Sequence, residues 1–243
     1  MTRAVGCLRD YRERFVAGFV CRCSTADGRH VPDDESHRTR KAERAQLAAL
    51  PVRMDPHFVN NTLATVQYLV RRDVGAADFL LSQLIRYLRD AVPGPHQPLS
   101  TLQQEFETAD ACLQIARMRM GGRLAVTLDL PEHLREQPFP PTVLRALVDT
   151  VLEHSVEPKL GRVAVLVRAR REATEPALPG RLVVEVVDDG VGLVRGNALG
   201  AAAGLCTVRG LLAEAFGDRA LLSVMEAPAN VTIAGMIIAE TAP

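Results

Sequence analysis

Apolar residues recur at helical spacing between residues 41 and 120. A first stripe holds Val59, Leu63, Val66 and Val70, and a second holds Leu81, Leu84, Ile85 and Leu88. A third stripe holds Leu102, Phe106, Ala109, Leu113, Ala116 and Met120. Because residues three and four apart lie on one side of a helix, each stripe predicts an amphipathic helix. The stripes are narrow, so the three helices predict a bundle that a second subunit can complete.

The third of these helices has clear boundary signals. Three prolines interrupt the helical pattern in AVPGPHQP, residues 91–98. Directly afterwards, Ser100 and Gln103 have the spacing of a capping box, in which both side chains bond free backbone N–H groups. Gly121 and Gly122 are suited to end the helix. We therefore expect this helix to begin at Ser100 and to end before the two glycines.

The pattern changes after Gly122. Alternating, β-branched segments predict strands at 123–130, 162–170, 181–189, 219–226 and 231–240. Helical spacing predicts two helices among them, at 140–155 and 204–216. Strands with two interleaved helices predict an α/β sandwich, with one sheet covered on one face. The expected fold class is therefore α+β, a helical hairpin or bundle (41–122) followed by an α/β sandwich (123–243). Residues 1–40 form an N-terminal segment and linker of unknown role.

The composition narrows the class of partner. Lys plus Arg and Asp plus Glu both number 29, so the formal net charge is zero. Nucleic acids and anionic membranes normally need a basic surface, so neither is expected as a partner. Five scattered cysteines without zinc-like spacing predict reduced thiols. No apolar run approaches the ~20 residues that span a bilayer, and we expect a cytoplasmic protein.

A glycine turn follows one of the predicted strands, in VVDDGVGL at 186–193. Asp188 stands at the strand end, where a carboxylate can accept a hydrogen bond from an exocyclic amine such as that of adenine. Gly190 and Gly192 allow the backbone to approach a ligand closely or to adopt positive φ. The alternative is a tight turn between strands. Downstream, a glycine-bearing loop at 196–210 opens a helix whose free N–H groups suit phosphate oxygens.

One histidine in the helical part allows two interpretations. MDPHFVNNTL, at 54–63, places His57 behind a proline and one helical turn ahead of Asn61. A neutral imidazole has a free lone pair at pH 7, so His57 can act as a nucleophile. Asn61 could hydrogen-bond that imidazole or a phosphate on it. Alternatively, His57 is an ordinary buried histidine of the helical core.

These stretches resemble a known family. MDPHFVNNTL resembles the internal region of LytS-like sensor histidine kinases, as does LQIARMRMGGRL at 113–124. FPPTVLRALVD, at 139–149, falls where that family has the helix that carries its metal-binding box. The glycine turn and the loop after it resemble the GHKL-type ATP-binding domain. The resemblance extends over residues 45 to 240 and implies a GHKL-type fold for the α/β part.

The resemblance implies roles for the matching residues, with ATP and Mg²⁺ as cofactors. His57 becomes the phosphoacceptor, Asp149 the acid of the metal-binding box and Thr150 a weak magnesium ligand. The implied ATP-binding residues are Asp188, Gly190, Gly192, Gly200, Gly204, Thr207 and Arg209. Four of the matched positions depart from the family pattern. Asp149 replaces a glutamate, Thr150 and Thr207 replace asparagines, and Ala202 replaces a glycine.

Three functions stay open at this point. The first is a two-component histidine kinase that autophosphorylates His57 with ATP and passes the phosphoryl group to the receiver domain of a response regulator. Such a kinase would form a homodimer through its helical region and take its stimulus from a separate sensor or membrane partner. The second is a degenerate kinase that binds nucleotide or a partner without efficient phosphotransfer. The third is a GHKL ATPase without a phosphohistidine.

Overall fold

The structure is a computed structural model that describes residues 56–91, 100–172, 180–193, 198–228 and 231–239. The helices of this part are α3 (Pro56–Val70), α4 (Val74–Ala91), α5 (Leu102–Arg119), α6 (Val143–Val151) and α7 (Ala198–Phe216). The main strands are β2 (Leu124–Asp129), β4 (Val163–Glu172), β5 (Arg181–Asp188), β6 (Ala220–Ala227) and β7 (Val231–Ala239). Two short strands, β1 (Ser100–Thr101) and β3 (Pro138–Phe139), pair antiparallel with each other.

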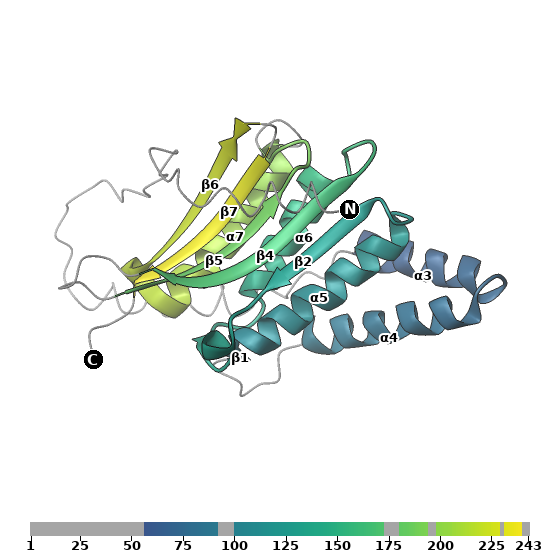
Figure 1. Ribbon diagram of the computed structural model, residues 1–243, viewed down its shortest axis with the longest axis horizontal. Helices are drawn as coiled ribbons and strands as arrows, with labels where there is room; N and C mark the ends of the chain where they lie inside the picture. The colour runs from purple at the N-terminus through teal and green to yellow at the C-terminus, as the bar shows by residue number, and fades with distance from the viewer. Residues whose placement is uncertain (1–55, 92–99, 173–179, 194–197, 229–230, 240–243) are drawn as a thin grey trace, which may run out of the picture.

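The five main strands form one mixed sheet in the order β2-β4-β5-β7-β6. Strands β2 and β4 are parallel, and the other neighbours are antiparallel. Helices α5, α6 and α7 cover one face of this sheet, while α3 and α4 form a hairpin that packs beside α5 (Figure 1). The expected α+β fold, a helical part followed by a GHKL-type sandwich with one face covered by helices, is confirmed.

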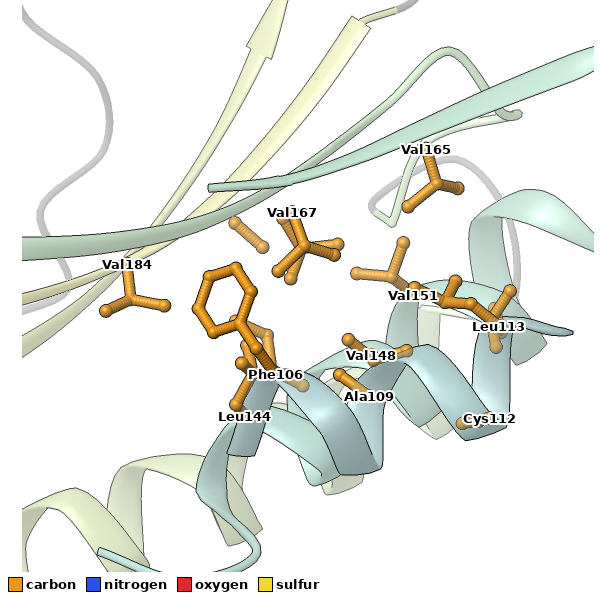
Figure 2. Close-up of a cluster of buried hydrophobic side chains, with 14 of the residues drawn as sticks. Phe106, Ala109, Cys112, Leu113, Leu144, Val148, Val151, Val165, Val167 and Val184 are labelled. Carbon is orange, nitrogen blue, oxygen red and sulfur yellow. The ribbon is translucent and has the colours of Figure 1, made fainter. Parts of the chain in front are cut away.

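The main core lies between the sheet and the helices. In β4, alternate residues point to opposite faces, so Val165 and Val167 both face the helices. There they meet Phe106 of α5 and Val148 of α6 (Figure 2). Leu166, between them in sequence, belongs instead to a smaller cluster with Val187 and Ile233 on the opposite face. The alternation along β4 in the sequence therefore corresponds to side chains on the two faces of the sheet, as expected.

Helix α5 contributes to both parts of the molecule. It packs against α4 of the hairpin and also against α6 and β2 of the sandwich. The sequence pattern assigned this helix to the helical part, with a boundary near residue 122. That division stays a prediction, but the core residues of α5 belong to the layer that covers the sheet.

The cap of α5 is one residue later than predicted. Thr101, not Ser100, is the N-cap: its Oγ1 accepts a hydrogen bond from the Gln104 N–H, at 3.3 Å. The Gln104 side chain in turn accepts from the Thr101 N–H, at 3.3 Å, which completes a capping box. Ser100 instead pairs with Phe139 in the small β1–β3 sheet. The sequence contains both candidate boxes, and the pairing of β1 selects the second.

Helix α7 begins earlier than predicted. Residues 198–203 are helical, so the expected glycine loop at 196–210 is wrong for its described part from Ala198 onward. Three consecutive alanines, which have the highest helix propensity, extend the helix toward its N-terminus despite the glycines. Among the described residues, Leu199–Arg219 alone has the length and apolar composition of a membrane-spanning helix, against our expectation of no such run. Because α7 packs on α6 and β6, its apolar residues also serve the sandwich.

The predicted stripes of the hairpin are only partly buried. In α3, Leu63 and Val70 are exposed, although they belong to the first predicted stripe. In α4, Leu84 is buried, but Leu81 and Ile85 are exposed. Val74 extends this exposed stripe of α4 by two turns. The hairpin therefore presents apolar side chains that no other part of the described chain covers.

Candidate functional site

Asp188 lies at the end of β5, completely buried. Its Oδ1 accepts hydrogen bonds from the Ser155 hydroxyl, at 2.5 Å, and from the Gly190 N–H, at 2.8 Å. Its Oδ2 is buried and has no hydrogen-bond partner among the described residues. Since a buried carboxylate oxygen without a partner costs free energy, this atom is suited to accept a bond from a ligand. One oxygen of the carboxylate is thus fixed, and the described residues leave the other without a donor.

Burial raises the pKa of Asp188 to about 6. The hydrogen bonds from Ser155 and Gly190 oppose this shift because they stabilise the charged form, and the nearby Asp189 adds to it. At neutral pH the carboxyl group is therefore mostly ionised. In that form Oδ2 is an acceptor only, which matches the donor character of an exocyclic amine.

Gly190 and Gly192 are glycines for identifiable reasons. A Cβ at residue 190 would overlap the carbonyl oxygen and the hydroxyl of Ser155. Gly192 has φ of +91°, and a Cβ there would lie 2.8 Å from a carboxylate oxygen of Glu226. A side chain at residue 190 would push the turn away from Ser155. A side chain at residue 192 would strain the backbone of the turn. A simple tight turn explains the glycine at position 192, which has positive φ. It does not explain Gly190, because the atoms that exclude a Cβ there belong to Ser155, far away in the sequence.

Thr232 is a candidate site residue that the sequence did not reveal. It lies on β7 directly opposite Asp188 in the strand register. Its side chain is buried, and its Oγ1 has no hydrogen-bond partner in the part of the chain that the structure describes. A hydroxyl can donate and accept, so it complements the acceptor-only oxygen of Asp188. No local signal marks this threonine, because only strand pairing brings residues 188 and 232 together.

Ser155 also escaped prediction. The end of α6 continues as a π-helix, Leu152–Val156, in which Ser155 is fully buried. Besides its bond to Asp188, the Ser155 hydroxyl accepts from the Gly192 N–H at 3.1 Å, and its carbonyl oxygen accepts from the Val191 N–H at 2.9 Å. Such π-helical turns are frequent at functional sites. Ser155 therefore ties the end of α6 to the glycine turn.

Thr150 and Gly204 meet between α6 and α7. The Thr150 hydroxyl donates to the carbonyl oxygen of Ala146, one turn earlier, at 2.8 Å. A Cβ at residue 204 would overlap the Thr150 side chain, so Gly204 allows the two helices to approach closely. Gly204 therefore acts in helix packing as the structure describes it. Thr150 as a magnesium ligand stays a prediction, and its oxygen would have to bind the metal while donating to Ala146.

Asp149 faces the helical part of the molecule. Its Oδ1 accepts a hydrogen bond from the Cys112 thiol of α5 at 3.0 Å, and its Oδ2 accepts from the Tyr87 hydroxyl of α4 at 3.4 Å. Burial is the main cause that raises the pKa of both donors, and the charge of Asp149 adds to it, so both stay protonated at neutral pH. The predicted acid of the metal-binding box, on α6, is thus bonded to two other helices, α4 and α5.

His57 lies in the first turn of α3, and its side chain is outside the described part of the structure. Its neighbour Phe58 packs against Tyr87. Phe58 also lines a small cleft together with Asp149 and with residues of α4, α5 and the π-helix. Asn61 is half-buried one turn further along α3. The first turn of α3, which includes His57, is therefore close to the acid that the resemblance assigns to the metal-binding box.

The remaining predicted residues all lie on α7. Gly200 is in its first turn and half-buried. Thr207 is exposed, and its hydroxyl donates to the Ala203 carbonyl oxygen at 3.2 Å. Arg209 is half-buried further along the helix. The roles of these three residues toward ATP stay predictions.

The donor atoms fit the two expected cofactors differently. The free oxygens of Asp188 and Thr232, beside Gly190 and Gly192, fit the polar edge of a purine. In the part of the chain that the structure describes, no three His, Cys, Asp or Glu side chains gather as they would to hold a metal ion. The free oxygens at this corner therefore fit the polar edge of adenine, while Mg²⁺ stays an expectation from the resemblance.

Comparison with known proteins confirms the resemblance. Residues 45–124 match the family model described as histidine kinase. The sensor histidine kinase BtsS of Escherichia coli is 29% identical over 189 residues, which are 78% of this chain but 32% of that protein. The sensor protein LytS of Bacillus subtilis is 33% identical over 115 residues, 47% of this chain and 19% of that protein. Both matches thus cover a third or less of the relative's length.

Among solved structures, the histidine kinase domain of the blue-light activated kinase EL346 from Erythrobacter litoralis is similar at 21% identity. The TM-score is 0.40, with 82% of this chain and 95% of that chain covered.

Proposed function

As a relative of the LytS-like sensor histidine kinases, this chain combines a histidine-bearing helix with a GHKL-type sandwich, and we propose that it phosphorylates His57 with ATP. The observation that carries the proposal is the pair of free, buried oxygens at Asp188 and Thr232. Their residues are paired across β5 and β7 at the sheet end, next to a glycine turn that packs against Ser155. Adenine has the complementary exocyclic amine.

Three features support the binding of adenine at this corner. Asp188 Oδ2 would accept the exocyclic amine, while Ser155 and Gly190 hold Oδ1 and thus fix the orientation of the carboxylate. The Thr232 hydroxyl would bond a ring nitrogen directly or through water. Because both oxygens lack partners among the described residues, the ligand would satisfy groups that these residues leave buried without a bond.

The chemical step is the transfer of the γ-phosphoryl group. One imidazole nitrogen of His57 would use its lone pair to bond the γ-phosphorus, while the bond from that phosphorus to the β–γ bridging oxygen breaks and ADP leaves. Positioning dominates this class of reaction.

The phosphoryl group would then pass to an aspartate on the receiver domain of a response regulator. A carboxylate oxygen of that aspartate bonds the phosphorus as the bond to the histidine nitrogen breaks. We place this reaction in the cytoplasm. We propose that the stimulus comes from a separate sensor or membrane partner.

The hairpin supports a homodimer. Val74, Leu81 and Ile85 form an exposed apolar stripe on one side of α4, at spacings of seven and four residues. Leu63 and Val70 are exposed at a spacing of seven on α3. Burying such stripes against a second copy would build the four-helix bundle that the sequence pattern predicts.

A degenerate kinase is the second candidate. The Thr150 hydroxyl is bonded to Ala146, and both oxygens of Asp149 accept hydrogen bonds from the helical part. In this arrangement nucleotide would bind at the Asp188 corner without efficient phosphoryl transfer. The adenine corner is common to both candidates, and only the phosphate side distinguishes them.

The test uses the purified full chain with γ-labelled ATP and Mg²⁺. His57→Ala is compared with His133→Ala, which changes an exposed histidine in a 3-10 turn remote from the site. Acid-labile label that is lost only in His57→Ala supports the kinase. Nucleotide binding without label supports the degenerate kinase. Steady hydrolysis that is the same in both variants supports an ATPase without a phosphohistidine.

A further inference from the structure

Tyr87 connects the phosphoacceptor helix with the ATP-binding part. It lies on α4 with 1% of its surface exposed. Its ring packs against Phe58 of α3, with centroids 4.8 Å apart, and the guanidinium of Arg145 lies over the ring, 5.0 Å from its centre. Its hydroxyl donates to Asp149 on α6. One side chain thus contacts the first turn of α3 and two residues of α6.

Phe58 is held from a second direction. The guanidinium of Arg119 lies 5.4 Å from the centre of the Phe58 ring. Arg119 itself pairs with Glu157, just beyond the π-helix, at 3.2 Å. Phe58 is therefore enclosed by groups whose positions depend on α6 and its extension. Because Phe58 directly follows His57 in the helix, holding the phenyl ring also holds the backbone of the first turn of α3, to which His57 belongs.

We propose that Tyr87 is a positioning residue for the phosphorylation of His57. Its hydroxyl, bonded to Asp149, keeps the ring against Phe58, and the ring holds the first turn of α3 beside α6 of the same chain. Tyr87 acts through Phe58 and is not itself a catalytic residue. The expected effect of Tyr87 on phosphorylation rests on the proposed function. Its expected effect on the position of α3 does not.

The chemistry of the contact supports a role for the hydroxyl as well as the ring. In the buried environment beside Asp149, the pKa of Tyr87 is raised above its ordinary value, so the hydroxyl stays protonated and donates. Asp149 also accepts from Cys112, which fixes the carboxylate from the other side. A phenylalanine at position 87 would keep the ring contacts but leave the donor to Asp149 absent.

The experiment compares Tyr87→Phe with Tyr68→Phe in the full chain. Tyr68 is a matched control because it lies exposed on α3 and its hydroxyl contacts only Arg72 among the described residues. We expect Tyr87→Phe to lower kcat for His57 labelling about 3- to 10-fold, as the loss of one hydrogen bond implies, with KM for ATP changed less than about twofold. Tyr68→Phe should match the wild type.

Hydrogen exchange of the α3 amides provides a readout that does not need activity. Amides of residues 58–62 should exchange about 3- to 10-fold faster in Tyr87→Phe, because the first turn opens more often. Unchanged exchange and unchanged kcat would overturn the inference while leaving the proposed function intact. If the wild type fails to label His57, the proposed function fails and the exchange rates alone decide whether Tyr87 positions α3. A matching fall in kcat with a raised KM would indicate general damage to the site and count against positioning.

Discussion

At the scale of single residues, the nucleotide corner depends on one buried carboxylate. Asp188 has one oxygen held by Ser155 and Gly190, and one oxygen without a partner. A protein normally avoids such an orphaned acceptor, because its desolvation is not compensated. The most direct explanation is that a ligand supplies the missing donor.

Asp188→Asn should weaken ATP binding about 10- to 100-fold, since a bond to a charged acceptor is replaced by a neutral one or by a clash between two donors. Isothermal titration of the full chain with ATP measures this. Asp189→Asn is the matched control: the Asp189 side chain accepts from the Ala164 N–H at 2.9 Å and pairs with Lys159 at 3.0 Å. Equal affinity of the two variants would remove Asp188 from the site.

At the scale of elements, α6 receives its N-terminal cap from another helix. Its N-cap residue, Thr142, has φ of +69° and makes no side-chain cap. Glu105 of α5 instead accepts from the Thr142 N–H, at 3.2 Å, and from the Leu144 N–H. Burial of Glu105 nevertheless raises its pKa to about 7, and these hydrogen bonds and Arg145 only partly offset the shift. The helix start is therefore sensitive to pH.

The raised pKa of Glu105 determines whether the free energy of unfolding rises or falls with pH. A carboxyl that titrates near 7 in the folded chain and near 4.5 unfolded stabilises the fold fully below pH 4.5, and this contribution is lost as the pH rises through 7. From pH 5 to pH 8 the free energy of unfolding should fall by up to about 2 kcal/mol through this group. In Glu105→Gln this fall should be absent, as urea titrations at both pH values would show. An equally steep fall in the variant would contradict the assignment.

The exposed stripe of α4 leads to a prediction about assembly. Ile85→Glu should convert a dimer into a monomer at micromolar concentration, because a charge in the centre of a buried apolar seam is strongly unfavourable. Sedimentation velocity measures the change. Phe79→Glu is the control, since Phe79 is about as exposed but lies on another side of the same helix. A wild type that is monomeric, or a dimer that tolerates Ile85→Glu, would refute this interface.

At the scale of the whole molecule, α5 joins the two parts. Leu102, Phe106 and Leu113 are buried in the layer that covers the sheet, while α5 also packs against α4. A boundary at residue 122 would leave the helix-facing side of β2 and β4 without this cover. The two parts should therefore unfold together.

Two fragments test this arrangement. Residues 100–243 should fold, with a single cooperative thermal transition, whereas residues 123–243 should expose apolar surface and bind a hydrophobic dye. Circular dichroism and dye fluorescence distinguish the two states. If residues 123–243 fold cooperatively without α5, the boundary near residue 122 is the correct one.

The sequence by itself determined the elements and their class. Alternation at 162–170 and 181–189 predicted β4 and β5, and helical spacing predicted α3 to α7, because both periodicities arise locally from side-chain directions along the backbone. The same local signals marked Asp188, Gly190 and Gly192 at a strand end. Where two local signals competed, as at Ser100 and Thr101 or at the start of α7, the position of the boundary was predicted wrongly.

Only the tertiary structure decided which residues share the site. Thr232 reaches Asp188 through strand pairing, and Ser155 through a π-helical turn, so neither has a signal in its own neighbourhood. Tertiary packing likewise decides that Asp149 accepts a hydrogen bond from Tyr87 and that Gly204 lies against Thr150. Contacts between residues far apart in sequence depend on how whole elements pack, and packing is a property of the complete core and not of any one segment.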